Sequence, residues 1–106
     1  LTPFVADAQD EKTQAFVSAY EEKFGETPNQ FAADTYDAMY IIKAAAEKAG
    51  VTPDMSASDI CEAMKTAMTE ITFDGLTGEG MTWDADGEPS KAPKAMKIVD
   101  GAYTAM

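Results

Sequence analysis

The chain has 106 residues, which fits one domain, and its 45% apolar and 25% charged content is ordinary for a globular protein. Acidic residues outnumber basic ones 19 to 8, and the resulting net charge of -11 argues against binding to nucleic acid or to an anionic membrane surface. Histidine and arginine are absent and Cys61 is the only cysteine, which excludes imidazole catalysis, histidine metal ligands and a disulfide within the chain.

No targeting or membrane segment is visible in the sequence. No apolar run approaches the roughly 20 residues of a membrane span, and no signal peptide is recognisable. The chain begins at Leu1 and not at methionine, so we expect that it was cut from a longer protein.

The first part of the chain predicts an entry strand and a helix. Residues 1–9 are expected to be extended, because a proline near the start favours β or polyproline geometry in the residue before it. A helix is predicted from Asp10 to Phe24, where aromatic residues recur every four positions, and Gly25 is expected to end it.

A second helix is predicted from Gln30 to Ala49, with Gly50 as its terminator. It is apolar around most of its circumference, which is typical of a central helix covered on several sides. Two acids, Asp34 and Asp37, interrupt its apolar first half.

A third helix is predicted from Ala57 to Met68. Ser56 and Asp59 form a variant of the capping box at its start. Cys61 adjoins the apolar stripe of this helix, so we expect it to pack as a small hydrophobic residue.

After residue 70 the sequence predicts loops and a hairpin. The segment 75–80 holds three glycines, and turn geometry explains them better than a phosphate cradle, because their spacing matches no phosphate-binding motif. Strands are predicted at 81–84 and 95–103, joined by a connection that starts at Asp86 and Gly87. An EF-hand register would place Thr82 and Pro93 at ligand positions, so a calcium loop is not expected there.

The two acids of the second helix have several possible roles. Residues three apart share a helix face, so Asp34 and Asp37 could form a catalytic pair, but no partner base or metal ligand is visible nearby. Asp34 can complement the helix dipole or contact a ligand. Asp37 can pair with a lysine or accept hydrogen bonds from a neighbouring loop.

Two longer patterns resemble one known family. Residues 15–50 read AFVSAYEEKFGETPNQFAADTYDAMYIIKAAAEKAG, and residues 73–103 read FDGLTGEGMTWDADGEPSKAPKAMKIVDGAY. Their order and separation resemble the C-terminal third of type I periplasmic binding proteins, the leucine/isoleucine/valine-binding receptors of ABC transporters. The resemblance covers nearly all of the chain and implies an α/β fold with an entry strand, three helices and a β-hairpin.

The resemblance also implies an organisation and a function. Residues 1–70 would be the helical part of one lobe, and residues 71–106 would be a glycine-rich loop and a hairpin crossing toward a second lobe. The two-lobed parent would capture a small solute, such as an amino acid, and deliver it to a membrane permease. It would be periplasmic or extracellular, with or without a lipid anchor, and it would be neither an enzyme nor a cofactor protein.

The resemblance places solute contacts in the loop that enters the second helix. The matching residues are Phe31, Ala33 and Asp34. Branched-chain receptors resemble one another in having an aromatic residue at the position of Ala33, so alanine here opens the pocket and argues against a branched-chain solute. The isolated segment is expected to bind solute poorly, because much of the pocket would be missing, and to associate with itself through uncovered helix faces.

The sequence leaves two other functions open. A free-standing acidic domain would bind another protein through its helix faces and its hairpin. An enzyme would use Asp34 and Asp37 for catalysis, but the chain lacks the other residue types that such chemistry usually needs.

Overall fold

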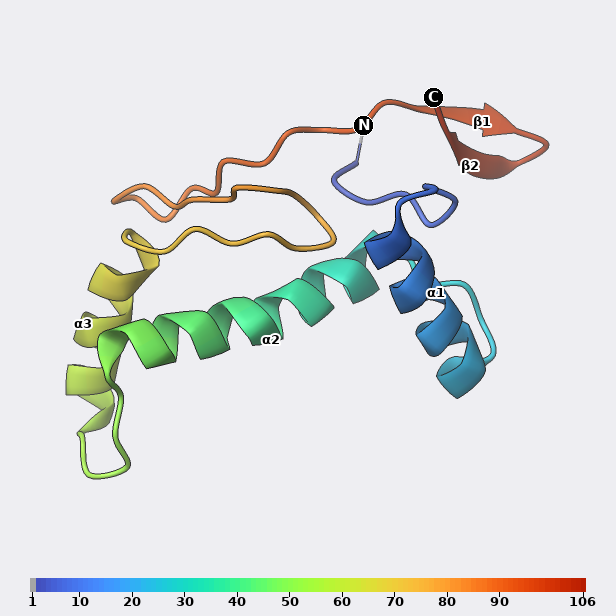
Figure 1. Cartoon of the computed structure of the whole chain (residues 1–106). Coiled ribbons are helices and arrows are strands. Elements are labelled where there is room, and N and C mark those ends of the chain that lie inside the picture. The colour runs from blue at the N-terminus through green and yellow to red at the C-terminus, as the bar shows by residue number, and fades with distance from the viewer. Residues whose placement is uncertain (1) are drawn as a thin grey trace.

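The computed structural model describes residues 2–106, which form three helices followed by a two-stranded hairpin (Figure 1). The longest helix forms the axis of the molecule, and the two shorter helices lie across its two ends. The elements in chain order are α1 (Glu11–Phe24), α2 (Gln30–Ala49), α3 (Ala57–Met68), β1 (Met96–Val99) and β2 (Ala102–Ala105).

Local capping explains where α1 begins and ends. The carboxylate of Asp10 accepts a hydrogen bond from the N–H of Thr13, and Gly25 closes the helix in the left-handed conformation at φ 74°. Burial raises the pKa of Asp10, but hydrogen bonds from the N–H and hydroxyl of Thr13, together with the charge of Lys94 and the backbone N–H of Asp10, hold the pKa below its usual value. The predicted helix is confirmed, with Asp10 as its cap.

The predicted bounds of α2 and α3 are also confirmed. Asn29 caps α2 by accepting from the N–H of Ala32, and Gly50 ends it at φ 66°. Ser56 caps α3 by accepting from the N–H of Asp59. The packing expected of Cys61 is wrong, because this residue is exposed.

A small core joins α1, α2 and two irregular segments. Phe4 from the entry segment, Val17 of α1, Ala33 of α2 and Leu76 pack together. The ring of Phe16 meets that of Phe4 edge to face, with centroids 5.9 Å apart. The core therefore lies at the first turns of α2, where the entry segment, α1 and the loop after α3 converge.

The entry segment does not form the strand predicted for residues 1–9. Thr2 makes one antiparallel bridge with Lys94, through backbone hydrogen bonds of 3.1 and 2.7 Å, and the segment then turns into the core. Leu1 lies outside the described residues. The entry segment is held by the burial of Phe4 and Val5 and not by a continuous ladder of backbone hydrogen bonds.

The predicted pairing of strands 81–84 and 95–103 is wrong. The chain folds back within the second of these segments, so that Val99 pairs with Ala102 across Asp100 and Gly101. These two residues have φ angles of 50° and 81°, the geometry of a two-residue hairpin turn favoured by Asp-Gly. The sequence contains three Asp-Gly pairs that could start such a turn, at 74–75, 86–87 and 100–101, and the last one makes the hairpin.

Candidate functional site

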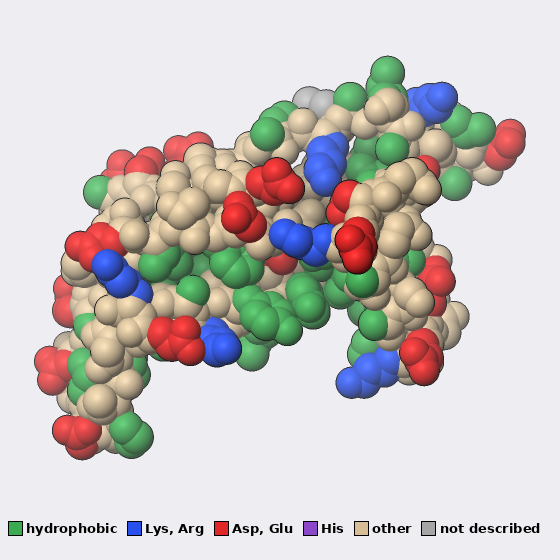
Figure 2. Space-filling view, in the orientation of Figure 1, with side chains coloured by type: hydrophobic (Ala, Val, Ile, Leu, Met, Phe, Trp, Pro, Cys, Tyr) green, Lys and Arg blue, Asp and Glu red, His purple; other side chains and the backbone are tan. Residues whose placement is uncertain are grey.

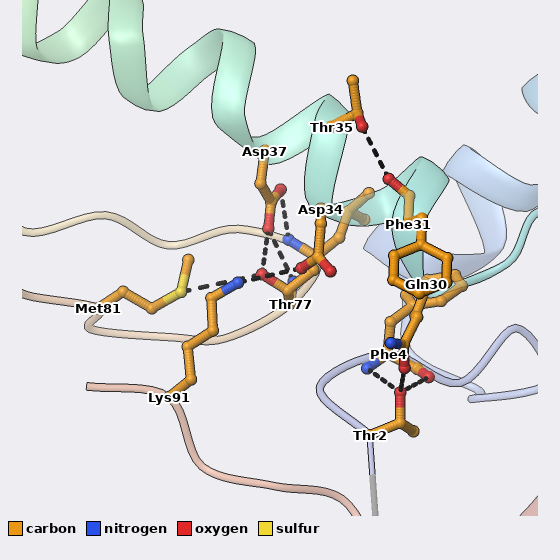
Figure 3. Close-up of polar contacts among 11 residues, drawn as sticks. Thr2, Phe4, Gln30, Phe31, Asp34, Thr35, Asp37, Thr77, Met81 and Lys91 are labelled. Atoms are coloured by element: carbon orange, nitrogen blue, oxygen red, sulfur yellow. Dashed lines mark hydrogen bonds and ion pairs between the residues drawn. The ribbon is translucent and has the colours of Figure 1, made fainter. Parts of the chain in front are cut away.

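The two acids in the first half of α2 have different surroundings (Figure 3). Asp37 is 2% exposed, and its carboxylate accepts three hydrogen bonds from the segment after α3. The N–H of Leu76 donates to one oxygen (2.9 Å), and the N–H and hydroxyl of Thr77 donate to the other (2.8 and 2.7 Å). Of the two roles left open for Asp37, the structure shows that it accepts hydrogen bonds from a neighbouring loop.

The segment 73–81 forms a compact loop around this carboxylate, and we call Asp37 with residues 75–77 the Asp37 clasp. Phe73 and Met81 exchange two backbone hydrogen bonds of 2.9 Å at the base of the loop. At Gly75, an added Cβ would lie 2.6 Å from Cγ of Asp37, so a side chain there would displace the carboxylate. Gly80, at φ 60°, serves turn geometry as predicted, and the close approach at Gly75 is a role that the sequence did not predict.

Asp34 lies one turn earlier and forms an ion pair. Nζ of Lys91 is 3.1 Å from Oδ1 of Asp34, and the side chains of Lys91 and Asp34 are 26% and 37% exposed. The pair joins the first turns of α2 to the irregular segment before the hairpin. Within the part of the chain that the structure describes, Asp34 is thus a neutralised carboxylate at the surface.

Phe31 and Ala33, the other two predicted contact residues, lie in opposite environments. The side chain of Phe31 is 68% exposed, whereas Ala33 has no exposed surface and packs in the core. Ala33 therefore cannot touch a solute in this conformation, because Phe4, Val17 and Leu76 surround it. The structure brings Phe31 and Asp34 to the surface at the start of α2 and places Ala33 beneath them.

Phe31 borders a groove of about 740 Å³, which we call the Phe31 groove. Its walls come from the entry segment, the start of α2 and the hairpin, and no charged side chain lines it among the described residues. The lining residues are Thr2, Phe4, Val5, Ala6, Pro28, Asn29, Gln30, Phe31, Met96, Ile98 and Tyr103.

Long-range contacts bring the walls of the Phe31 groove together. The hydroxyl of Thr2 donates to Oε1 of Gln30, which ties the entry segment to α2. The carboxylate of Asp7 accepts from the N–H of Ala105 at 3.2 Å, which ties the hairpin to the entry segment. Sequence reasoning missed the hairpin residues of this groove, since no local signal indicates that residues 2–7 meet residues 94–105.

A second apolar surface lies between α1 and α3. Figure 2 shows hydrophobic side chains gathered in the hollow below α2. Phe16 of α1 packs against Tyr36 with ring centroids 4.9 Å apart, and Tyr36 packs against Tyr40 at 5.0 Å. Hydrogen bonding to Tyr40, together with burial, raises the pKa of Tyr36. We call this surface the aromatic hollow.

The described residues hold no metal centre and no spanning helix. Among residues 2–106, no three acidic or cysteine side chains come together as metal ligands. None of the described helices is both long and apolar enough to cross a membrane. Asp34 and Asp37 do not act as a carboxylate pair, because Lys91 engages the first and a loop engages the second.

Comparison with known proteins gives the chain a family and a fold. The model of a family described as periplasmic binding protein matches residues 1–102. A protein described as a putative branched-chain amino acid ABC transporter from Rhodospirillum rubrum is 30% identical, with a TM-score of 0.71 over 99% of this chain. The chain covers 29% of that protein. No curated protein matches the sequence.

More distant structures share the fold. An ABC transporter substrate-binding protein from Desulfitobacterium hafniense, in complex with Leu, is 22% identical, with a TM-score of 0.75 over 97% of this chain and 29% of its own. A solute-binding protein from R. palustris, in complex with benzoate, is 20% identical, with a TM-score of 0.74 over 98% of this chain and 27% of its own. The chain thus spans less than a third of these relatives.

Proposed function

The chain belongs to the periplasmic binding protein family, and on this premise we propose that it is part of the solute-binding protein of an ABC transporter. The membership confirms the resemblance and the α/β fold class predicted from the sequence. The whole protein would capture a small solute, either an amino acid or a related compound, and deliver it to a membrane permease. It would work in the periplasm or outside the cell and would perform no chemical reaction.

The observation that carries this proposal is the Phe31 groove. Solute sites are concave and mostly apolar, with a few polar groups that fix orientation, and this groove has such a lining, with Thr2, Asn29 and Gln30 as its polar members. The exposed ring of Phe31 stands at its edge. We propose that Phe31 and Asp34 contact the solute and that Ala33 supports them from the core.

The organisation of the chain supports the same function. Residues 2–70 hold the three helices, and the hairpin projects away from them in Figure 1, anchored to the entry segment through Asp7. We propose that residues 71–106 cross toward a second lobe, whose closure over the Phe31 groove would complete the solute site.

Calorimetry on the longer receptor that carries this segment tests the proposal. L-leucine and benzoate are suitable first probes, and Phe31→Ala should weaken the binding of the solute that the receptor takes by about tenfold, the loss expected when one well-packed aromatic contact is removed. Phe24→Ala is the matched control, because Phe24 is an exposed phenylalanine on α1 that does not line the groove. Equal affinities of the two variants would refute the site.

We also propose that the isolated segment associates with itself through the aromatic hollow. Tyr36 and Tyr40 are exposed in this hollow, and Met39 and Ile42 are further exposed apolar side chains of α2. Soluble proteins usually cover apolar surface of this kind. Light scattering at high concentration tests this, and a purely monomeric mass would contradict it.

A further inference from the structure

The β1–β2 hairpin turns one of its two faces toward the Phe31 groove. Ile98 and Tyr103 are partners across the ladder, and both line the groove. Met96 also lines it, and because it lies two residues before Ile98 on the same strand, its side chain points to the same face. Val99 alternates with these residues and belongs to the opposite face. One face of the hairpin is therefore a wall of the groove.

The entry-segment wall of the groove is fixed by burial, whereas the hairpin wall is not. Phe4 and Val5 of the entry segment are 3% and 4% exposed, and Phe4 is part of the core. On the hairpin wall, Ile98 and Tyr103 are 70% and 72% exposed. Within residues 2–106, the backbone of neither strand comes close to a helix. The position of the hairpin wall therefore depends on a few local contacts and not on packing against the helices.

Two contacts hold the open end of the hairpin against the entry segment. Just before β1, Lys94 forms the antiparallel bridge with Thr2. At the last residue of β2, the N–H of Ala105 donates to the carboxylate of Asp7, 3.2 Å from Oδ1 and 3.4 Å from Oδ2. In Figure 1 this open end lies beside the entry segment, and the turn of the hairpin projects away from the helices. The bridge alone would leave the hairpin free to swing, so the carboxylate of Asp7 restrains its angle to the groove.

Asp7 connects the two walls at one edge of the groove. It directly follows Ala6 of the entry-segment wall, and its carboxylate reaches the strand that carries Tyr103 of the hairpin wall. The contact is exposed, so water competes with it and little of the folding free energy depends on it. Its larger effect is on the distance between the walls. A wall that is restrained before binding lowers the ordering cost that a ligand would otherwise have to overcome.

We propose that the hairpin face is the second wall of the solute site, with Tyr103 as its main contact, and that Asp7 is the positioning residue that holds this wall in place opposite Phe31. This inference rests on the proposed function and adds two residues to its site. Tyr103 is the largest side chain of the hairpin face, and its ring supplies contact area while its hydroxyl stays free to bind water or a polar group. A solute in the groove would then lie between the ring of Phe31 on α2 and the ring of Tyr103 on β2.

Calorimetry on the longer receptor, with L-leucine and benzoate as probes, tests both residues. Tyr103→Ala should weaken the binding of the solute that the receptor takes by about tenfold, through the loss of one aromatic contact. Val99→Ala is the matched control, because it removes an apolar side chain from the opposite face of the same hairpin, and it should change the affinity by less than about twofold. Asp7→Ala removes the acceptor for the N–H of Ala105 and should weaken binding by about fivefold.

Conservative and double variants separate positioning from charge and from folding. Asp7→Asn removes the same charge as Asp7→Ala but keeps an oxygen that can accept from Ala105, so its affinity should stay within about twofold of wild type. In a Tyr103→Ala background, Asp7→Ala should cause no further loss, because the contact that Asp7 positions is already gone. Asp86→Ala removes an exposed acid outside the groove and should leave the affinity unchanged. If Asp7→Ala does not fold, judged by its thermal melt, Ala105→Pro removes the N–H donor instead and should cause the same loss.

A distance measurement on the same receptor shows whether the hairpin moves. Spin labels at Cys61, which is exposed on α3, and at Lys97→Cys, which is exposed on β1, report the distance between the hairpin and the helices. Asp7→Ala should shift or broaden the distribution of distances, whereas Asp7→Asn should leave it as in wild type. An unchanged distribution in Asp7→Ala would overturn the positioning role.

The outcomes distinguish this inference from the proposed function. A loss of affinity in Phe31→Ala but not in Tyr103→Ala would overturn the role of the hairpin wall and leave the solute-binding function intact. Equal losses in Asp7→Asn and Asp7→Ala would overturn the positioning role, since the charge and not the hydrogen bond would then be the cause. A wild-type receptor that binds neither probe would overturn the proposed function and, with it, this inference.

Discussion

The loop of residues 73–81 is stabilised by burial of its side chains, whereas the β1–β2 hairpin is stabilised by backbone pairing. The loop has almost no regular secondary structure, yet Leu76, Thr77 and Met81 are buried within it. The hairpin has a regular ladder, yet most of its side chains are exposed, including Ile98 and Tyr103. Regular backbone pairing and tight packing therefore occur in different parts of this molecule.

The difference arises from where each segment finds its hydrogen-bond partners. The loop donates to the carboxylate of Asp37, which α2 holds in place, so its irregular backbone is satisfied while it is buried. The hairpin satisfies its own backbone and joins the rest of the chain chiefly through Asp7 and the bridge of Thr2 with Lys94. We therefore expect folding stability to depend on the Asp37 clasp and to be almost insensitive to the hairpin surface.

The largest effect is expected for Asp37→Ala. The substitution leaves three buried donors of Leu76 and Thr77 without a partner, and we expect a loss of about 3–5 kcal/mol in the free energy of unfolding. Urea denaturation followed by circular dichroism measures this loss. Asp34→Ala is the matched control on the same helix and should cost less than about 1 kcal/mol, because its pair is partly exposed.

The second-largest loss of unfolding free energy is expected for Gly75→Ala. The new Cβ would lie within 2.7 Å of three atoms of the Asp37 carboxylate, and relieving that overlap should cost about 2–3 kcal/mol. Gly87→Ala is the comparison, because nothing lies within 4 Å of the position its Cβ would take and only its φ of 85° opposes a side chain. That strain should cost about 1 kcal/mol, and equal losses at the two sites would contradict the clasp.

A smaller loss is expected for Thr77→Val, which preserves side-chain shape and removes one donor. The hydroxyl of Thr77 donates to Asp37 at 2.7 Å, while the two backbone donors remain, so we expect about 1–2 kcal/mol. The same denaturation experiment measures it. A loss as large as that of Asp37→Ala would mean that the side chain of Thr77, and not the backbone of the loop, holds the clasp together.

The parts of this fold that sequence could predict are those set by local signals. All three helices lie where periodicity, the terminators Gly25 and Gly50 and the cap Ser56 placed them, because such signals act within one turn. The hairpin is the exception, because Asp86-Gly87 and Asp100-Gly101 carry the same turn signal. The hairpin that forms is also held by Asp7, which is distant in sequence.

The candidate site was predictable only in part, for the same reason. Phe31 and Asp34 reach the surface, and their contact with a solute stays a prediction. The partner of Asp34 lies 57 residues away, and nothing near Lys91 in the sequence indicates it. Ala33 was expected at the pocket and lies in the core, because Phe4, far away in sequence, packs over that face of α2. Positions on a helix face follow from periodicity, whereas what covers the face depends on tertiary contacts.

The smallest effect is expected on the hairpin surface. Ile98→Thr keeps a β-branched side chain on β1, and because Ile98 is 70% exposed the unfolding free energy should change by less than about 0.5 kcal/mol. Ile98 also lines the Phe31 groove, so the same variant should weaken solute binding by the longer receptor although it leaves folding unchanged. A loss of stability without a loss of affinity would contradict the contrast between the buried loop and the exposed hairpin. Ile98 would then contribute to the folded core and not to the solute site.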